Sequence, residues 1–523
     1  MGTAGATGAY TTGAFDAVTG GRSLDVGTAS DDTALLGIDR KDPSSPDGTV
    51  VTLFEITNRF GSELTTIDAR IVSGVDGPID PNGLETPSRL APGQSGTIAV
   101  PLVCTTNRQN EEIEVEIAAR GAGESVTVNR TVRVSCIADS PVCAPRDLPG
   151  CVENSLPGPP ENGTNCSVSI DTDDFDETIA GRTEVGGALR VNATGDADLT
   201  LRGSASIGDH VRIEAGDDVI FDVGGNASVD GVVQLDTPGS IDATIDQDID
   251  GLCSNAGGDV DVEVGGGSTV DGDASLESNA DVTFDITGGS EITGRAGVDA
   301  RGDADVLLDG DEAIGADLTV DAGDDATLDL SGSSRVEGDA TVRADGDATV
   351  TLTGSSYVGG DLTVEAAGSV DLDLGSASVH GDVTVETDGD ADVELSGAAS
   401  IDGRLTLDVA GDVDVELSSS TVGGDLAVET TGSVELAVDW GSSVGGTVTV
   451  VAVDQAAVDV EIELQGGGSV AGDVTIETAG EVEVEIEGQG AIEGDLTVEG
   501  ASEVEIDGCA NVAGQVTPAS ACD

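Results

Sequence analysis

A seven-residue phrase recurs through the last two-thirds of this 523-residue chain, and most of its repeats are 21 or 22 residues apart. The phrase consists of an aliphatic residue, any residue, Gly, usually Asp, a second aliphatic residue, Thr and Val. Its occurrences begin at Val185, Ile207, Val229, Val270, Ile292, Ile314, Val336, Val358, Val379, Ile401, Val422, Val444, Val470, Ile492 and Val512. A fixed period of this length, built from short strands and glycine corners, is typical of a β-solenoid, whose coils bury their apolar faces only by stacking.

Each period predicts three short strands. Between Gly360 and Gly375 two alternating apolar and polar runs are separated by glycine-containing corners, and residues 377–379 supply a third run. The gap from Val229 to Val270 holds two periods with a degenerate coil near Ile249, which gives about 16 coils. At ~4.8 Å per coil the rod would be roughly 75 Å long. Parallel crossovers are overwhelmingly right-handed, so we expect a right-handed helix with Val, Leu, Ile and Ala ladders inside.

Two other repeat architectures fit less well. Leucine-rich repeats share the period, but this chain lacks their Leu/Asn consensus. Calcium-binding nonapeptide rolls need a nine-residue repeat, which is also missing.

The first quarter of the chain lacks the repeat. Residues 8–137 contain about seven alternating strands between Gly, Pro, Asn and Asp turns, for example 49–56, 96–103 and 125–132, a pattern that predicts an antiparallel β-sandwich. The expected fold is therefore all-β, with a sandwich in 1–137, a Pro/Gly/Cys linker in 138–166 and a right-handed parallel β-helix of about 22 residues per coil in 167–523.

The charge balance restricts both the setting and the partners. Asp and Glu number 101 against 20 Lys and Arg, the formal net charge is -81, Lys41 is the only lysine, and no basic residue follows Arg404. Like charges at this density favour expansion unless counterions screen them, so we expect a setting of molar salt. Nucleic acid and anionic membranes are disfavoured as partners because both need a basic surface, and no apolar stretch approaches the ~20 residues of a membrane span.

Two patterns bear on stability. Disorder is the alternative for an acidic chain with few aromatics, but the regular alternation of aliphatic and polar residues argues for half-buried strands. Adjacent coils would place carboxylates such as Asp371, Asp392, Asp414 and Glu435 at matching positions. Two unit charges ~4.8 Å apart in water repel by about 0.9 kcal/mol, so we predict that the rod loosens in low salt.

The cysteines and sequons suggest export. Eight cysteines in an oxidising compartment predict four disulfides of open connectivity, formed among Cys104, Cys136, Cys143, Cys151, Cys166, Cys253, Cys509 and Cys522. Zinc is the alternative, but the chain has no Cys-x-x-Cys pair. Five glycosylation sequons begin at Asn129, Asn162, Asn165, Asn192 and Asn226. Residues 1–3 open without the features of a signal peptide, so we expect any secretion signal to have been removed or to lie upstream.

Candidate sites for chemistry do not stand out from this background. Carboxylate pairs act in glycosidases, yet they occur by chance on so acidic a chain, and residues 167–523 hold only nine arginines and no lysine. No catalytic residue or cofactor is predicted. Gly-Asp corners offer calcium ligands, with hydrated acidic turns as the alternative, and the candidates are Asp303, Asp305, Asp390 and Asp392.

The few ring-bearing side chains are expected to have no catalytic role. His210 and His380 are expected to be isolated, solvated corner residues. The lone Trp440 is expected to act as a local cap or to belong to an inserted loop, with a sugar platform as the alternative. The repeats hold no other large rings than Phe221, Phe284 and Tyr357, with Phe175 just before them.

Two segments carry family resemblances. The runs 11–15, 22–26 and 34–38 resemble the start of a family of secreted β-domain proteins from halophilic archaea, and the layout is distantly similar to camelysin and TasA-type fibre subunits. These resemblances imply a β-sandwich that polymerises by strand donation. The phrase Val-x-Gly-Asp-Leu-Thr-Val resembles polymer-forming bactofilin-like β-helices, although coils of 22 residues are longer than that family's pattern.

Together these patterns predict a non-enzymatic structural or adhesive protein. We expect it on the cell surface of an extreme halophile or secreted from it, with a stiff acidic rod and cations such as calcium condensed on its surface. Expected partners are further copies of the chain or other surface-layer components. The alternative is a β-helix that binds or cleaves carbohydrate.

Overall fold

The structure is a computed structural model of the whole chain. It describes residues 36–41, 44–46, 50–60, 62, 64–73, 84, 86–87, 89–101, 108–121, 125–137, 152–153, 166–452 and 458–522. The chain divides into two compact units, Met1–Pro141 and Val142–Asp523. Each unit is described by itself.

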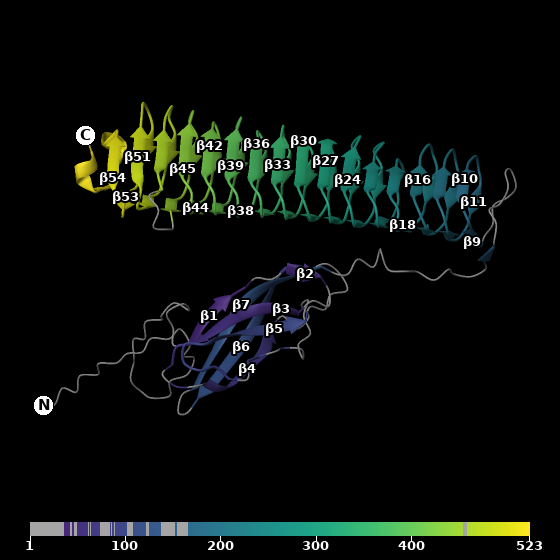
Figure 1. The fold of residues 1–523 in the computed structure, drawn as a ribbon, viewed down its shortest axis with the longest axis horizontal. Coiled ribbons are helices and arrows are strands. Elements are labelled where there is room, and N and C mark those ends of the chain that lie inside the picture. The colour runs from purple at the N-terminus through teal and green to yellow at the C-terminus, as the bar shows by residue number, and fades with distance from the viewer. Residues whose placement is uncertain are drawn as a thin grey trace. The chain divides into compact units, whose positions relative to one another are not determined.

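The first unit is a two-sheet β-structure (Figure 1). One sheet has the order β1-β3-β5 and the other β2-β7-β6-β4. The strands are β1 (Leu36–Arg40), β2 (Ser44–Pro46), β3 (Val50–Asn58), β4 (Leu64–Ser73), β5 (Ser95–Pro101), β6 (Arg108–Gly121) and β7 (Ser125–Ile137). Side chains of both sheets, including Phe54, Ile98, Ile113 and Val132, form one buried core. The predicted antiparallel β-structure is confirmed, and one short edge pairing differs from it, because the three-residue strand β2 runs parallel to β7.

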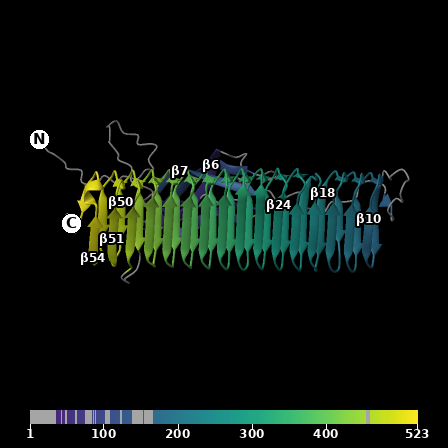
Figure 2. The ribbon, with the colours of Figure 1, turned by 90° about the horizontal axis from the view of Figure 1, so that it is seen from above.

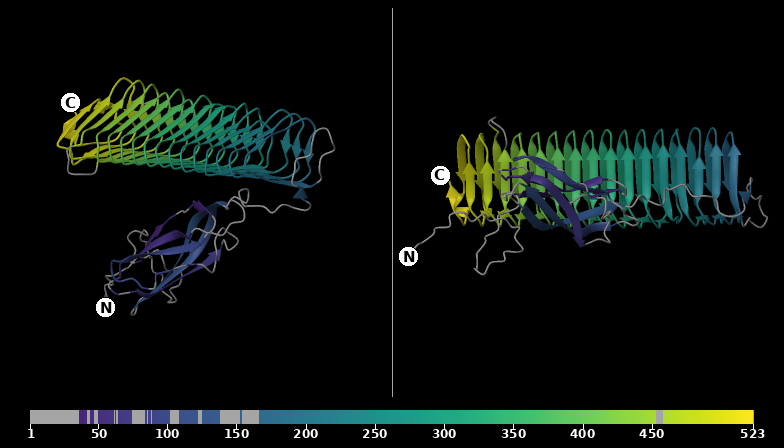
Figure 3. Two further views of the ribbon diagram at one scale, coloured as in Figure 1. Left: turned by 45° about the vertical axis from the view of Figure 1, so that its right-hand side comes forward. Right: turned by 90° about the horizontal axis from the view of Figure 1, so that it is seen from below.

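The second unit is a parallel β-solenoid. Figure 2 shows one of its long sheets from above, and Figure 3 shows the coils stacked one upon the next. We call this 16-stranded sheet sheet one. Its strands are β10 (Phe175–Ile179), β13 (Ala197–Leu201), β16 (Val219–Val223), β19 (Ile241–Ile245), β21 (Val260–Val264), β24 (Val282–Thr287), β27 (Ala304–Gly310), β30 (Ala326–Gly332), β33 (Ala348–Thr353), β36 (Val370–Gly375), β39 (Ala391–Ser396), β42 (Val413–Ser418), β45 (Val434–Asp439), β48 (Val460–Leu464), β51 (Glu481–Ile486) and β54 (Glu503–Asp507). One strand per coil confirms the prediction of about 16 coils.

Two further sheets complete each coil. Sheet two begins with β8 (Val152–Glu153) and β9 (Ser167–Thr172) and continues through one strand of every coil, such as β35 (Leu362–Ala366), to β55 (Val516–Thr517). Sheet three consists of two-residue strands such as β37 (Ser378–Val379). It is interrupted at the degenerate coil, where the isolated bridge between Ile249 and Val270 replaces a strand pair, as the sequence predicted. Since β8 pairs with β9, the solenoid already begins inside the predicted linker.

The apolar ladders follow from the alternation within each strand. Val350, Leu372, Val393 and Val415 are neighbours on successive strands of sheet one, and all four are fully buried. Burying one such side chain contributes roughly 1.5–3 kcal/mol, and a coil gains it only when the next coil covers its edge. The predicted aliphatic interior is confirmed. The right-handed sense of winding stays a prediction.

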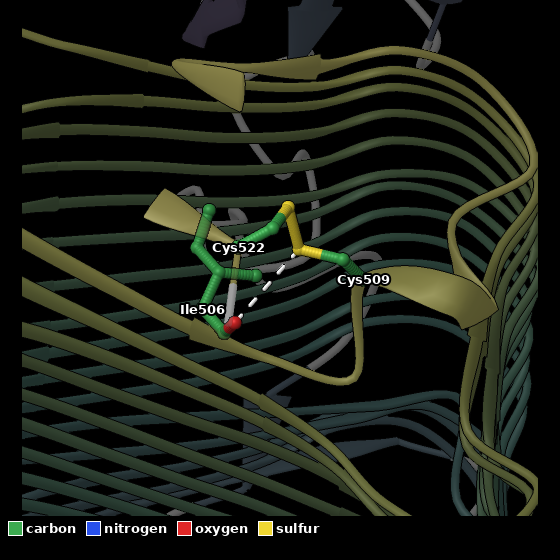
Figure 4. Close-up of a disulfide and its surroundings, with 3 residues drawn as sticks. All are labelled: Ile506, Cys509 and Cys522. Carbon is green, nitrogen blue, oxygen red and sulfur yellow. Dashed lines mark hydrogen bonds between the residues drawn. A yellow bond between two sulfur atoms is a disulfide. The ribbon is translucent and has the colours of Figure 1, made fainter. Parts of the chain in front are cut away.

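The last coil is closed by a disulfide. After β54 the chain forms two short 3-10 helices, η1 (Cys509–Asn511) and η2 (Ala519–Ala521). Cys509 and Cys522 are bonded with a Cα–Cα distance of 5.9 Å, and the Sγ atom of Cys509 lies 3.8 Å from the carbonyl oxygen of Ile506 (Figure 4). Ile506 also forms an isolated parallel bridge with Cys522. The chain end therefore covers part of the open edge of sheet one, which would otherwise offer unpaired backbone groups.

Candidate functional site: the acidic face of sheet one

The outer face of sheet one carries only acidic and neutral side chains. Residues alternate inward and outward along each strand, and the sixteen strands of this sheet contain no Lys, Arg or His. From β36 to β54 the first outward position is acidic in every coil. We call this series row one, and it consists of Asp371, Asp392, Asp414, Glu435, Glu461, Glu483 and Glu505. No basic side chain of the sheet neutralises it.

A second series lies two residues further along the same strands. We call it row two, and its carboxylates are Asp373, Glu394, Glu416, Glu463, Glu485 and Asp507, with Ala437 as the single neutral member. The two rows together make one acidic face over seven adjacent strands. The carboxylates of each row lie beside one another because the strands of successive coils pair in the same register.

The local environment makes these carboxylates harder to ionise. Burial raises the pKa of Asp392, and the neighbouring charges of Asp414 and Asp371 raise it further. Burial also raises the pKa of Glu461, with added repulsion from Glu435 and Glu463 among others. Desolvation and like charges both disfavour the charged form. The ionised carboxylates of this face therefore repel one another at neutral pH, and cations near them would reduce that repulsion.

A different set of aspartates has a structural task. At the corner before sheet one, a side-chain Oδ1 atom accepts a hydrogen bond from the backbone N–H of the matching residue in the next coil. Asp325 donates to Asp303 at 3.1 Å, and Asp412 donates to Asp390 at 2.8 Å. These bonds satisfy backbone groups where the strand ladders stop. The repeated Gly-Asp corner thus links neighbouring coils, a role that the sequence did not reveal.

The pKa values of some corner carboxylates move in the opposite direction from those of the rows. The hydroxyl and the backbone N–H of Ser433 both donate to Asp412, and they lower its pKa. Thr447 holds Asp425 in the same way, at the corner before sheet two. Hydrogen bonds to a carboxylate favour its charged form. The solenoid therefore contains carboxylates that its fold stabilises as anions and others that it destabilises.

The four predicted calcium ligands do not form one site. Asp390 and Asp392 line a groove of about 660 Å³, together with Asp412 and Asp414 of the next coil. Asp303 and Asp305 lie four coils away, where Asp305 has Thr283 and Thr327 as row neighbours. Oxygen ligands of this kind suit hard cations, so the groove could hold a cation through carboxylates of two adjacent coils.

One tighter carboxylate group lies elsewhere. Asp196, Asp217 and Asp218 are exposed and have ligand atoms all within 4.8 Å of one another, the one such group among the described residues. This group was not among the sites predicted from the sequence, and only the adjacent Asp217-Asp218 pair at a corner could have signalled it.

No family model matches this chain, and no curated protein matches it in sequence. Within the residues that the structure describes, no helix is long and apolar enough to cross a membrane. The function is therefore inferred from the side chains of the solenoid and their geometry.

A second groove of about 970 Å³ runs over the corner between sheets two and one. Its centre is Arg343, whose guanidinium lies 3.3 Å from Asp321 and 3.0 Å from Glu365. Because both carboxylates belong to adjacent coils, the arginine joins three coils by charge. This arrangement neutralises part of the groove locally.

The histidines differ from expectation. His210 is only 7% exposed, and its Nδ1 atom lies 3.0 Å from Asp209, so the prediction of a solvated residue was wrong. His380 is exposed but not isolated, because its ring stacks on Tyr357 with centroids 5.4 Å apart. The Tyr357 hydroxyl donates to Glu337 at 2.7 Å. The sequence could not show the contacts of Tyr357 with His380 and Glu337 because they join separate coils.

The large apolar rings also divide into two groups. Phe221 and Phe284 point inward and are fully buried, which removes them from any surface site. Trp440 is 73% exposed at the corner after β45.

The cysteines and sequons are only partly described. The Cys509–Cys522 disulfide is present, and Cys166 and Cys253 are each disulfide-bonded. These two are not each other's partner, because Cys166 precedes β9 while Cys253 lies in β20 (Gly251–Ala256), four strand spacings or ~19 Å away. Cys104, Cys143, Cys151, Asn162, Asn165 and the side chain of Cys136 lie outside the described residues.

Three sequon asparagines are described. Asn226 is exposed at a corner, and Asn129 is exposed within β7. Asn192 is held on sheet two, where its amide donates to Asp171 at 2.7 Å. Asn226 is therefore the sequon in the solenoid with the freer side chain, and glycosylation at any of the five stays a prediction.

Proposed function

We propose that this chain is a non-enzymatic structural or adhesive protein of the cell surface or the extracellular space of an extreme halophile. Its solenoid serves as a stiff rod whose carboxylates are neutralised by condensed cations, calcium among them, rather than by basic side chains. The N-terminal unit anchors the rod or joins it to further copies. No cofactor is assigned to it.

The observation that supports this proposal is the acidic face of sheet one. Seven stacked carboxylates in row one and six in row two have no basic partner in the sheet. A protein that folds at ordinary ionic strength gains nothing from such an array, whereas one that works in brine gains a hydrated, soluble surface. The disulfide at the last coil supports an oxidising compartment.

Electron microscopy of the purified protein in molar NaCl tests the structural role. We expect rods, either single or joined into filaments, and the same grids after dialysis into dilute buffer should show their loss. Compact particles that are indifferent to salt would contradict the proposal.

The second candidate function is carbohydrate binding without cleavage. It is favoured by one observation, the exposed Trp440 on a solenoid whose one other exposed large apolar side chain among the described residues is Ile220.

A further inference from the structure

Trp440 is the only tryptophan of the chain and lies at the corner between sheets one and three. Its side chain is 73% exposed. The other exposed large hydrophobic residues among those described are Val72, in the first unit, and Ile220, on β16 near the opposite end of the solenoid. The indole is therefore a single apolar platform in a polar, acidic surface.

The backbone at this corner suits glycine rather than tryptophan. Trp440 and Gly441 both have positive φ angles, 53° and 82°. Four other corners between these sheets have the same pair of left-handed residues, and their first positions are occupied by Gly266, Gly288, Gly397 and Gly466. Turns with two left-handed residues select glycine or asparagine because a Cβ atom is crowded there. A bulky residue in this conformation signals a role other than folding.

The next coil leaves the indole uncovered. A Cβ atom added at Gly466 would lie 3.9 Å from Cδ2 of Trp440, so any side chain at that position would approach the ring. The flanks of the platform are polar, since the Ser419 hydroxyl donates to the Trp440 carbonyl at 3.3 Å and the Gln465 amide donates to Glu463 at 2.6 Å.

We propose that Trp440 is the stacking platform of a binding site for neutral glycans. A pyranose ring presents an apolar face of C–H groups, which packs on an indole, and an edge of hydroxyls, which bond to amide, hydroxyl and carboxylate groups. Ser419 at the matching corner of the preceding coil, and Gln465 and Glu463 of the following coil, offer such groups beside this corner. A protein partner or a lipid would need a wider apolar patch, and a cationic ligand would lose most of its attraction in molar salt.

The glycan site rests on the adhesive role proposed above and gives that role a ligand. The site can be disproved while the structural role of the rod is retained. Rods that lose their shape in low salt and bind no glycan would retain the structural role and exclude the site.

The test uses the intrinsic fluorescence of the full chain in molar NaCl, because Trp440 is its only indole. Soluble hexasaccharides of glucose, mannose and N-acetylglucosamine serve as probes. We expect at least one to change the emission saturably, and calorimetry to show that Trp440→Gly weakens its binding at least tenfold. Tyr357→Ala, which removes the half-buried aromatic ring stacked on His380, should leave binding unchanged.

Stability separates a binding role from a structural one. Trp440→Gly and Trp440→Asn should unfold at the same temperature as the unmodified protein or at a higher one, since both residues suit the left-handed backbone. A lowered midpoint in both variants would show that the indole supports the fold. Absence of saturable change with every sugar, or an equal response to tetramethylammonium, would overturn the glycan site.

Discussion

The acidic face predicts that equivalent carboxylates contribute unequally to the salt dependence of stability. Asp392 and Asp305 both occupy the first outward position on sheet one. Asp392 has Asp371 and Asp414 beside it, whereas Asp305 has Thr283 and Thr327. Neutralising one charge at each position therefore removes two repulsive pairs along the row in the first case and none along the row in the second, where the diagonal neighbour Asp285 is the carboxylate that Asp305 repels. The two substitutions Asp392→Asn and Asp305→Asn are a matched pair.

The magnitude follows from the spacing of the coils. Charges ~4.8 Å apart in water repel by about 0.9 kcal/mol, so the six neighbour pairs of row one oppose folding by roughly 5 kcal/mol without screening. The Debye length is about 3 Å at 1 M salt and about 30 Å at 10 mM, so this repulsion falls to about a fifth in brine and stays nearly complete in dilute buffer. Asp392→Asn should therefore stabilise the solenoid by about 1.5 kcal/mol at low salt and by a few tenths at 1 M.

Urea unfolding followed by circular dichroism, at about 10 mM and about 1 M NaCl, measures these differences. We expect the unmodified protein to lose several kcal/mol of unfolding free energy between the two conditions, a large fraction of the 5–15 kcal/mol of an ordinary domain. Asp305→Asn should have a clearly smaller effect than Asp392→Asn in dilute buffer, because it removes the repulsion of Asp285 but no repulsion along the row. Equal effects of the two substitutions, or an unfolding free energy independent of salt, would refute the argument.

Three further predictions follow from the same structure. The folded-state pKa values of Asp392, Asp414 and Glu461 are raised, so their ionisation weakens the fold as the pH rises from the ordinary carboxyl range, about 4, through those raised values. Thermal melting in dilute buffer should therefore occur at a higher temperature near pH ~4 than at pH ~7. Below pH ~4 the opposite contribution of Asp412 and Asp425, whose pKa values are lowered, should appear as a decline in melting temperature. Replacing Cys509 and Cys522 with serine should remove up to ~3 kcal/mol, seen as faster hydrogen exchange in β54 but not in β36. Cys253 is disulfide-bonded, but not to Cys166, Cys509 or Cys522. Mass spectrometry of unreduced peptides should therefore find Cys253 linked to Cys104, Cys136, Cys143 or Cys151. A peptide that links Cys166 to Cys253 would contradict the strand register of sheet two.

The repeat predicted most of the solenoid because its period is geometrically restrictive. Alternation within runs such as 370–375 determines which side chains point inward, and the 21 or 22 residue spacing places Leu372 over Val350 and beneath Val393. The degenerate coil near Ile249 was predicted for the same reason, since it is a departure from a regular pattern. Row one was likewise visible in part as Asp371, Asp392, Asp414 and Glu435.

Contacts between coils are where prediction from sequence was incomplete or wrong. The carboxylate of Asp303 meets the backbone of Asp325, twenty-two residues later, and nothing in a Gly-Asp corner shows whether that carboxylate faces water or the next coil. His210 was expected in solvent and is buried, while His380 meets Tyr357 across a coil boundary. Side-chain direction at a corner depends on local φ and ψ angles, which a period does not specify.

The sequence by itself determined the stacking of coils, the aliphatic interior and the excess of negative charge, because a period of two along each strand and a period of 22 along the chain leave few other ways to bury the apolar residues. Only the tertiary structure decided which aspartates bond to the neighbouring coil and which repel across it, and that Trp440 lies uncovered in a left-handed turn. These outcomes depend on distances of a few ångströms between residues about 22 positions apart, and such distances are set only when the coils pack.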